Sequence, residues 1–154
     1  MSITTTTHLN FRGEAREALE FYRSVFGGDI TVATYGDVGM PADVPGAANV
    51  VFGQVSTADG FRIMAYDIPG PAGGSPTAGE TRRENGMTIT DEPVFVSVRG
   101  DALDEVQRYW DRLSVGATII EPLAASAWSP GFGMLTDRFG VTWILDVAAE
   151  YAAE

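Results

Sequence analysis

The feature that most constrains the fold of this chain is an internal repeat, because its two halves predict the same succession of elements. Each half has the pattern of a strand, an amphipathic helix, a second strand and a hairpin. In the first half these elements are expected at residues 3–11, 14–26, 29–35, 49–57 and 61–68. In the second half they are expected at residues 93–99, 101–113, 117–121, 131–136 and 140–147. Duplicating a unit whose sheet has one uncovered face lets two copies enclose a cavity.

Local signals support the repeat. Apolar residues recur with helical spacing from Ala15 to Phe26, and Gly27-Gly28 follows where a helix C-cap is expected. The Asp59-Gly60 step predicts a tight hairpin turn. In the predicted repeat, Arg12-Gly13 corresponds to Arg99-Gly100 and Gly60 corresponds to Gly140.

Residues 69–92 separate the halves and are rich in Pro, Gly, Thr and charge without any period, so we interpret them as a linker. The chain is therefore predicted to be one domain over residues 1–154, with repeat one at about 1–68 and repeat two at 93–150. The predicted fold class is α+β. Two tandem β-α-β-β-β repeats would form a curved mixed sheet around a pocket, with the helices on the outer face.

Charge and composition exclude several classes of function. The formal net charge of −11 disfavours nucleic acid and anionic membrane partners and favours a cationic ligand. The chain has no cysteine, which excludes disulfides, thiolate nucleophiles and cysteine metal sites. No apolar run approaches the roughly 20 residues of a membrane span, and no signal peptide is evident, so we expect a cytoplasmic protein.

Two stretches resemble a known group. Residues 8–22, HLNFRGEAREALEFY, are similar to the opening of PhnB-like proteins of the glyoxalase/bleomycin-resistance, or vicinal oxygen chelate, superfamily. Residues 131–143, GFGMLTDRFGVTW, are similar to the closing hairpin of the same group. The resemblance covers nearly the whole chain and implies the duplicated fold, a homodimer and a small-molecule pocket.

The resemblance also allows a test for a metal site, because metal-dependent members hold a divalent ion with His and Glu from four equivalent strand positions. Here those positions are His8 (Thr7 on a gapless alignment), Phe95, Met64 and Ile144, of which three are apolar. Tyr66 and Asp146, the possible substitutes, would lie about 7 Å beyond the usual ligand positions. We therefore predict no metal ion and no cofactor.

Strand parity indicates which side chains share the face away from the helices, where a ligand would lie. His8 is the chain's single histidine, a weak candidate for a catalytic base and more simply a pocket residue bonded to a neighbour. Asp67, at a strand end, is interpreted as a turn residue rather than an acid catalyst. The predicted ligand-binding residues are His8, Asn10, Phe52, Gln54, Arg62, Met64, Tyr66, Phe95, Ser97, Trp128, Met134, Ile144 and Asp146.

Three functions follow as alternatives. The first is a metal-free protein that binds a small cationic or aromatic molecule, with no assigned reaction. The second is an enzyme, either a metal-dependent lyase, isomerase or dioxygenase with an atypical site around His8, or a metal-free acid–base catalyst that uses His8. The third is a structural or regulatory dimer with a collapsed cavity. The apolar residues at the metal-ligand positions count against a metal enzyme, and the polar residues on the pocket face count against a collapsed cavity. Together they favour the metal-free binding protein.

Overall fold

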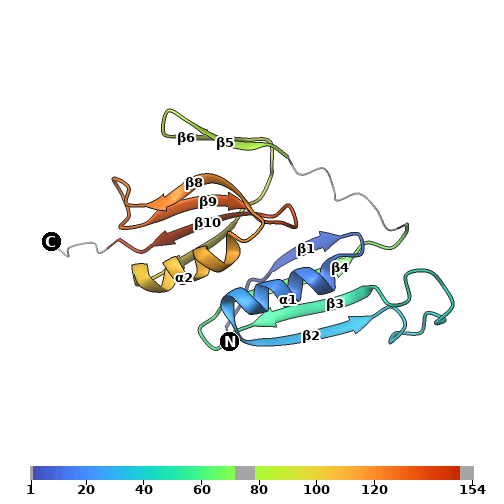
Figure 1. Cartoon of the computed structure of the whole chain (residues 1–154). Helices are drawn as coiled ribbons and strands as arrows, with labels where there is room; N and C mark the ends of the chain where they lie inside the picture. The colour runs from blue at the N-terminus through green and yellow to red at the C-terminus, as the bar shows by residue number, and fades with distance from the viewer. Residues whose placement is uncertain (1, 72–78, 150–154) are drawn as a thin grey trace. The chain divides into compact units, whose positions relative to one another are not determined.

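The computed structural model describes residues 2–71 and 79–149, and the chain divides into two compact units, residues 1–77 and 78–154. Figure 1 shows that each unit has a helix lying across one face of a sheet. The α+β class and the two repeated β-α-β-β-β units are confirmed, with one mixed four-stranded sheet in each unit. Neither of the two described helices has the length and apolar character that a membrane span requires.

The N-terminal unit contains β1 (Thr7–Phe11), α1 (Ala15–Phe26), β2 (Asp29–Thr34), β3 (Val50–Ser56) and β4 (Arg62–Asp67). Its sheet has the order β1-β4-β3-β2, in which β1 is parallel to β4 and the other pairs are antiparallel. The apolar stripe of α1 is buried against this sheet. A Cβ atom at Gly53 would overlap the Leu19 side chain, so the absence of a side chain there lets the helix approach closely.

The C-terminal unit repeats this order with β7 (Val96–Gly100), α2 (Leu103–Leu113), β8 (Thr118–Ala124), β9 (Phe132–Thr136) and β10 (Thr142–Val147). Its sheet has the order β7-β10-β9-β8, with β7 parallel to β10. Gly133 has the same role in this unit as Gly53 in the other, since it lets α2 approach the sheet. A Cβ atom at Gly133 would lie 2.7 Å from a carbon of the Trp110 ring. Trp143 and Leu145 are fully buried in this core.

The prediction of a linker over 69–92 is wrong for its second part. Residues Thr81–Glu84 (β5) and Met87–Thr90 (β6) form an antiparallel hairpin, and residues 72–78 lie outside the described part of the chain. Figure 1 shows the hairpin on the opposite side of the β8–β10 sheet from α2. Its turn is Asn85-Gly86, both with positive φ. This pair is a hairpin signal in the sequence, but β5 is polar throughout and only Met87 and Ile89 alternate in β6.

The strand register also corrects the alignment of the repeats. His8 pairs with Met64, four residues after Gly60, whereas Ile144, four residues after Gly140, pairs with Ser97. The residue equivalent to His8 is therefore Ser97 and not Phe95, which precedes β7. Arg12-Gly13 follows β1 but Arg99-Gly100 ends β7, so the two Arg-Gly steps are not equivalent. The shift is two residues, which leaves strand parity unchanged.

Candidate functional site

The face of each sheet that its helix does not cover, here called the helix-free face, carries most of the predicted ligand-binding residues. Alternate residues of β4, Ile63 and Ala65, are buried toward α1, so Arg62, Met64 and Tyr66 point to the other side. The same parity places Ser97, Met134, Ile144 and Asp146 on the helix-free face of the C-terminal sheet. Each unit therefore presents its own group of candidate residues.

On the N-terminal sheet, the helix-free face centres on His8. The imidazole Nδ1 lies 3.1 Å from Asn10 Oδ1, and the ring meets Tyr66 edge to face at 5.3 Å between centroids. Met64 pairs with both His8 and Gln54 across the sheet. The predicted hydrogen bond between His8 and a neighbour is thus present, and the predicted residues of this unit lie on one face: His8, Asn10, Phe52, Gln54, Arg62, Met64 and Tyr66.

A structural carboxylate lies at the end of β4, on the side of the sheet that α1 covers. Asp67 is only 1% exposed, and its carboxylate accepts the N–H groups of Gly13, Ala15 and Val50 at 2.7 to 3.0 Å. The Tyr35 hydroxyl donates to the Asp67 carbonyl oxygen at 2.7 Å, and burial, followed by the neighbouring Tyr66 and Asp67, raises the pKa of the Tyr35 phenol. Asp67 is therefore a strand residue that joins β4 to the start of α1, not the turn residue we predicted.

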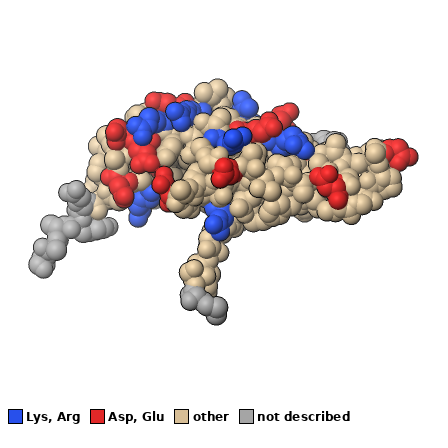
Figure 2. Space-filling view, turned by 90° about the horizontal axis from the view of Figure 1, so that it is seen from below, with Lys and Arg blue, Asp and Glu red and all other residues tan. Residues whose placement is uncertain are grey.

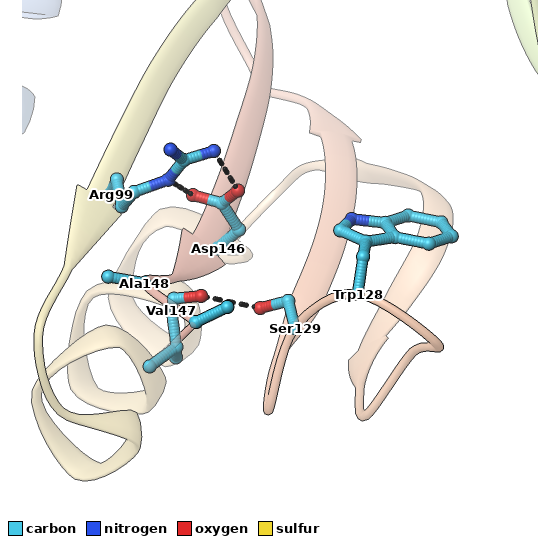
Figure 3. Close-up of a pocket in the computed structure, with 7 residues that line it drawn as sticks. Arg99, Trp128, Ser129, Asp146, Val147 and Ala148 are labelled. Atoms are coloured by element: carbon cyan, nitrogen blue, oxygen red, sulfur yellow. Dashed lines mark hydrogen bonds and ion pairs between the residues drawn. The ribbon is translucent and has the colours of Figure 1, made fainter. Parts of the chain in front are cut away.

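On the C-terminal sheet, a cavity of about 110 Å³ opens at the ends of β7 and β10. Its lining consists of Arg99, Trp128, Ser129, Asp146 and residues 147–149 (Figure 3). Arg99 and Asp146 form a bidentate ion pair, with Nε–Oδ1 and Nη2–Oδ2 distances of 3.0 and 2.9 Å. The Asp146 side chain is 7% exposed and that of Arg99 67%, so the pair presents its cationic partner to the opening.

Five residues of this lining were not predicted: Arg99, Ser129 and residues 147–149. Arg99 lies opposite Asp146 and shares the parity of Ser97, so the strand pattern already placed it on the helix-free face. Ser129 lies in the loop before β9, and its hydroxyl donates to the carbonyl oxygens of Gly131 and Val147 at 2.7 and 2.6 Å. No sequence signal marks Ser129. Trp128, which was predicted, is 55% exposed and meets Phe132 edge to face at 5.3 Å.

The β5–β6 hairpin covers another part of the same face. Thr142 donates to the Glu92 carboxylate, which follows the hairpin, at 2.9 to 3.0 Å, and Thr81 donates to it as well. The Thr88 hydroxyl meets the Met134 sulfur at 3.6 Å, and Met134 is fully buried. Met134 is thus a covered residue of this face, whereas Asp146 and Trp128 line the cavity.

The residues at the family's metal positions do not fit a metal ion. The register makes these positions His8, Ser97, Met64 and Ile144, which include only one of the usual nitrogen or carboxylate ligands. Within residues 2–71 and 79–149, no group of three or more His, Asp or Glu side chains is placed to share an ion.

The surface charge is mixed where charged side chains gather. All ten basic residues are arginine, and on the face in Figure 2 arginine and acidic side chains lie side by side. The charged side chains next to a binding site, and not the net charge of −11, therefore determine the electrostatic environment of a ligand.

Comparisons with known proteins agree with this fold. A family model described as the Glyoxalase/Bleomycin resistance protein/Dioxygenase superfamily matches residues 7–145. Protein YjdN of Escherichia coli K12 is 24% identical, over 93% of this chain and 94% of that protein. Protein PA1353 of Pseudomonas aeruginosa has a TM-score of 0.74 at 26% identity, and a PhnB protein of Bacillus cereus 0.68 at 23%. These structures cover 97% and 95% of this chain, and all of each is matched.

Proposed function

Because this chain belongs to the glyoxalase/bleomycin resistance protein/dioxygenase superfamily, we propose that it binds a small molecule without a metal ion, at the helix-free face of its C-terminal sheet. The observation that carries the proposal is the cavity in which Trp128 accompanies the Arg99–Asp146 ion pair. A few fixed polar groups beside an aromatic wall are the usual composition of a small-molecule site.

The size of the cavity supports a particular mode of binding. Typical ligand sites enclose roughly 300 to 1,000 Å³, and this cavity encloses about 110 Å³. It would hold one end of a ligand, and the rest of the molecule would lie against exposed side chains such as Trp128. The indole favours the aromatic class of the two that the sequence predicted, because aromatic rings stack or meet edge to face with a gain of about 0.5 to 1.5 kcal/mol.

The Arg99–Asp146 ion pair supports the proposal that this cavity is a ligand site and not part of a packed core. A carboxylate on an inward sheet face is costly to bury unless it is paired, and here the bidentate geometry supplies the pairing. The pair leaves the guanidinium at the opening, where it can orient a polar ligand group. We assign no reaction to the site, because the residues beside the cavity form neither a metal centre nor a nucleophile with a base.

The test is a screen of small aromatic compounds against the full chain, read by NMR of the indole N–H groups. Trp110 and Trp143 are 7% and 0% exposed and Trp128 is 55% exposed, so ligands should shift the Trp128 signal most. We expect Trp128→Leu, followed by ligand-observed NMR because the variant lacks this indole, to weaken binding about tenfold, as the loss of an aromatic contact of about 1.4 kcal/mol predicts. Binding should be unchanged after treatment with a chelator.

The matched control is Val115→Ala, which removes an exposed apolar side chain of the same unit after α2 and outside the cavity lining. If a chelator abolishes binding, or if Trp128→Leu and Val115→Ala weaken it equally, the proposed metal-free site is wrong.

A separate variant tests the acid–base alternative. If His8 is the catalytic base, His8→Ala should abolish any activity that is found.

A further inference from the structure

The underside of the β5–β6 hairpin is polar, although it faces a sheet. Alternation along β5 places Arg82 and Glu84 outward, where they form an ion pair with both side chains about half exposed. Thr81 and Arg83 then face the sheet, as do their cross-strand partners Thr90 and Thr88. A hairpin that only completed a core would present apolar side chains on this side.

Arg83 is the unusual member of this underside. Its side chain is 14% exposed, and its Nη1 donates to the Thr88 hydroxyl at 2.9 Å. Its Nε is buried and has no hydrogen-bond partner among the described residues. The carboxylate of Glu121 lies 3.7 Å away, too far for a hydrogen bond, and its side chain is 41% exposed. A buried donor without an acceptor is costly, so an acceptor supplied by a ligand would be favoured.

The same guanidinium lies over Phe132, which contacts the cavity residue Trp128 but does not itself line the cavity. Its Cζ is 5.4 Å from the centroid of the Phe132 ring, and Trp128 meets that ring at 5.3 Å. Trp128 also lines the cavity, and Phe132 pairs across the sheet with Asp146. One small molecule that contacts Trp128 is therefore within reach of Arg83.

We infer that the ligand is a small aromatic acid, whose ring lies against Trp128 and Phe132 and whose carboxylate is bound by Arg83. This inference rests on the proposed small-molecule site and names its ligand class. The carboxylate takes the place of the Glu121 carboxylate, which is near the guanidinium but not bonded to it. A planar guanidinium matches a carboxylate with two parallel hydrogen bonds, which an amide or an ammonium group cannot reproduce.

The test compares benzoate with benzamide, an uncharged probe of nearly the same shape, by titrating the full chain and following the Trp128 indole signal. We expect wild-type protein to bind benzoate at least about tenfold more tightly than benzamide, as a charged hydrogen bond predicts. Arg83→Met should remove this preference. Arg82→Met is the matched control, because Arg82 is the adjacent arginine of the same strand and faces outward.

Two further variants keep the test informative if Arg83→Met disturbs the hairpin. Arg83→Lys retains the charge but loses the planar fork, so benzoate should bind more weakly than to wild type and more tightly than to Arg83→Met. Glu121→Gln removes the competing carboxylate and should tighten benzoate binding without changing benzamide binding.

The outcomes separate this inference from the function on which it rests. If benzoate and benzamide bind equally and Arg83→Met changes neither affinity, the small-molecule site stands and the acid assignment is overturned. If neither these probes nor any compound of the aromatic screen shifts Trp128, both fail. A benzoate preference lost in Arg83→Met and kept in Arg82→Met supports the inference.

Discussion

Single residues on the two sheets show how a carboxylate can be buried for different purposes. Asp67 accepts three backbone N–H groups and fixes the start of α1 to the end of β4. Asp146 is held by one arginine at the edge of a cavity. The Asp67 oxygens accept hydrogen bonds from the backbone and serve the fold. The Asp146 oxygens instead hold the Arg99 guanidinium at the cavity opening, where a ligand can contact it.

The Asp67 carboxylate should therefore be a major contributor to stability. We expect Asp67→Ala to lower the free energy of unfolding by about 3 kcal/mol or more, because three backbone donors would lose their acceptor in a buried site. Urea denaturation followed by circular dichroism measures the change. Asp43→Ala, at an exposed loop carboxylate of the same unit, should change it by less than about 0.5 kcal/mol. Equal midpoints for the two variants would contradict this role.

At the scale of elements, the β5–β6 hairpin is attached to its sheet through polar groups. Glu92 accepts hydroxyl groups from Thr81 and Thr142, and Thr136 shares a 2.8 Å hydrogen bond with Thr142. Polar attachments of this kind are worth about 1 kcal/mol each, so the hairpin should open more readily than the strands beneath it.

Glu92→Ala should accordingly increase hydrogen exchange in residues 81–90 by about tenfold, which corresponds to a loss of about 1.4 kcal/mol. Exchange in β9 and β10 should remain slow. The comparison is Glu84→Ala, which removes a half-exposed carboxylate from the outward side of the same hairpin. Similar exchange in the two variants would show that Glu92 is not the attachment.

At the scale of the whole molecule, the homodimer implied by the family resemblance stays a prediction. Each unit leaves a helix-free sheet face with polar and aromatic side chains, and we propose that two chains pair whether or not a ligand is bound. Sedimentation velocity at micromolar concentration should give a species of twice 16.4 kDa. A species of 16.4 kDa under the same conditions would refute the dimer.

The sequence by itself determined the duplication, the element order within each repeat and the faces of the strands of the repeats, because these depend on periodicity and turn residues that are local properties of the chain. It could not determine the register of the repeats, since Arg12-Gly13 and Arg99-Gly100 look alike but lie in a loop and in a strand. It also missed β5 and β6, because β5 is polar throughout and only two apolar residues, Met87 and Ile89, alternate in β6.

Only the tertiary structure decided the partners of the buried charges. Asp146 was identified as a charge on an inward face, but its pairing with Arg99 depends on β7 lying beside β10, which are more than 40 residues apart in the chain. The sequence places Arg83 in a predicted linker, whereas the folded chain places its guanidinium over the Phe132 ring. Side-chain direction follows from local geometry, whereas the contacts between distant segments follow from packing, and the candidate site consists mainly of such contacts.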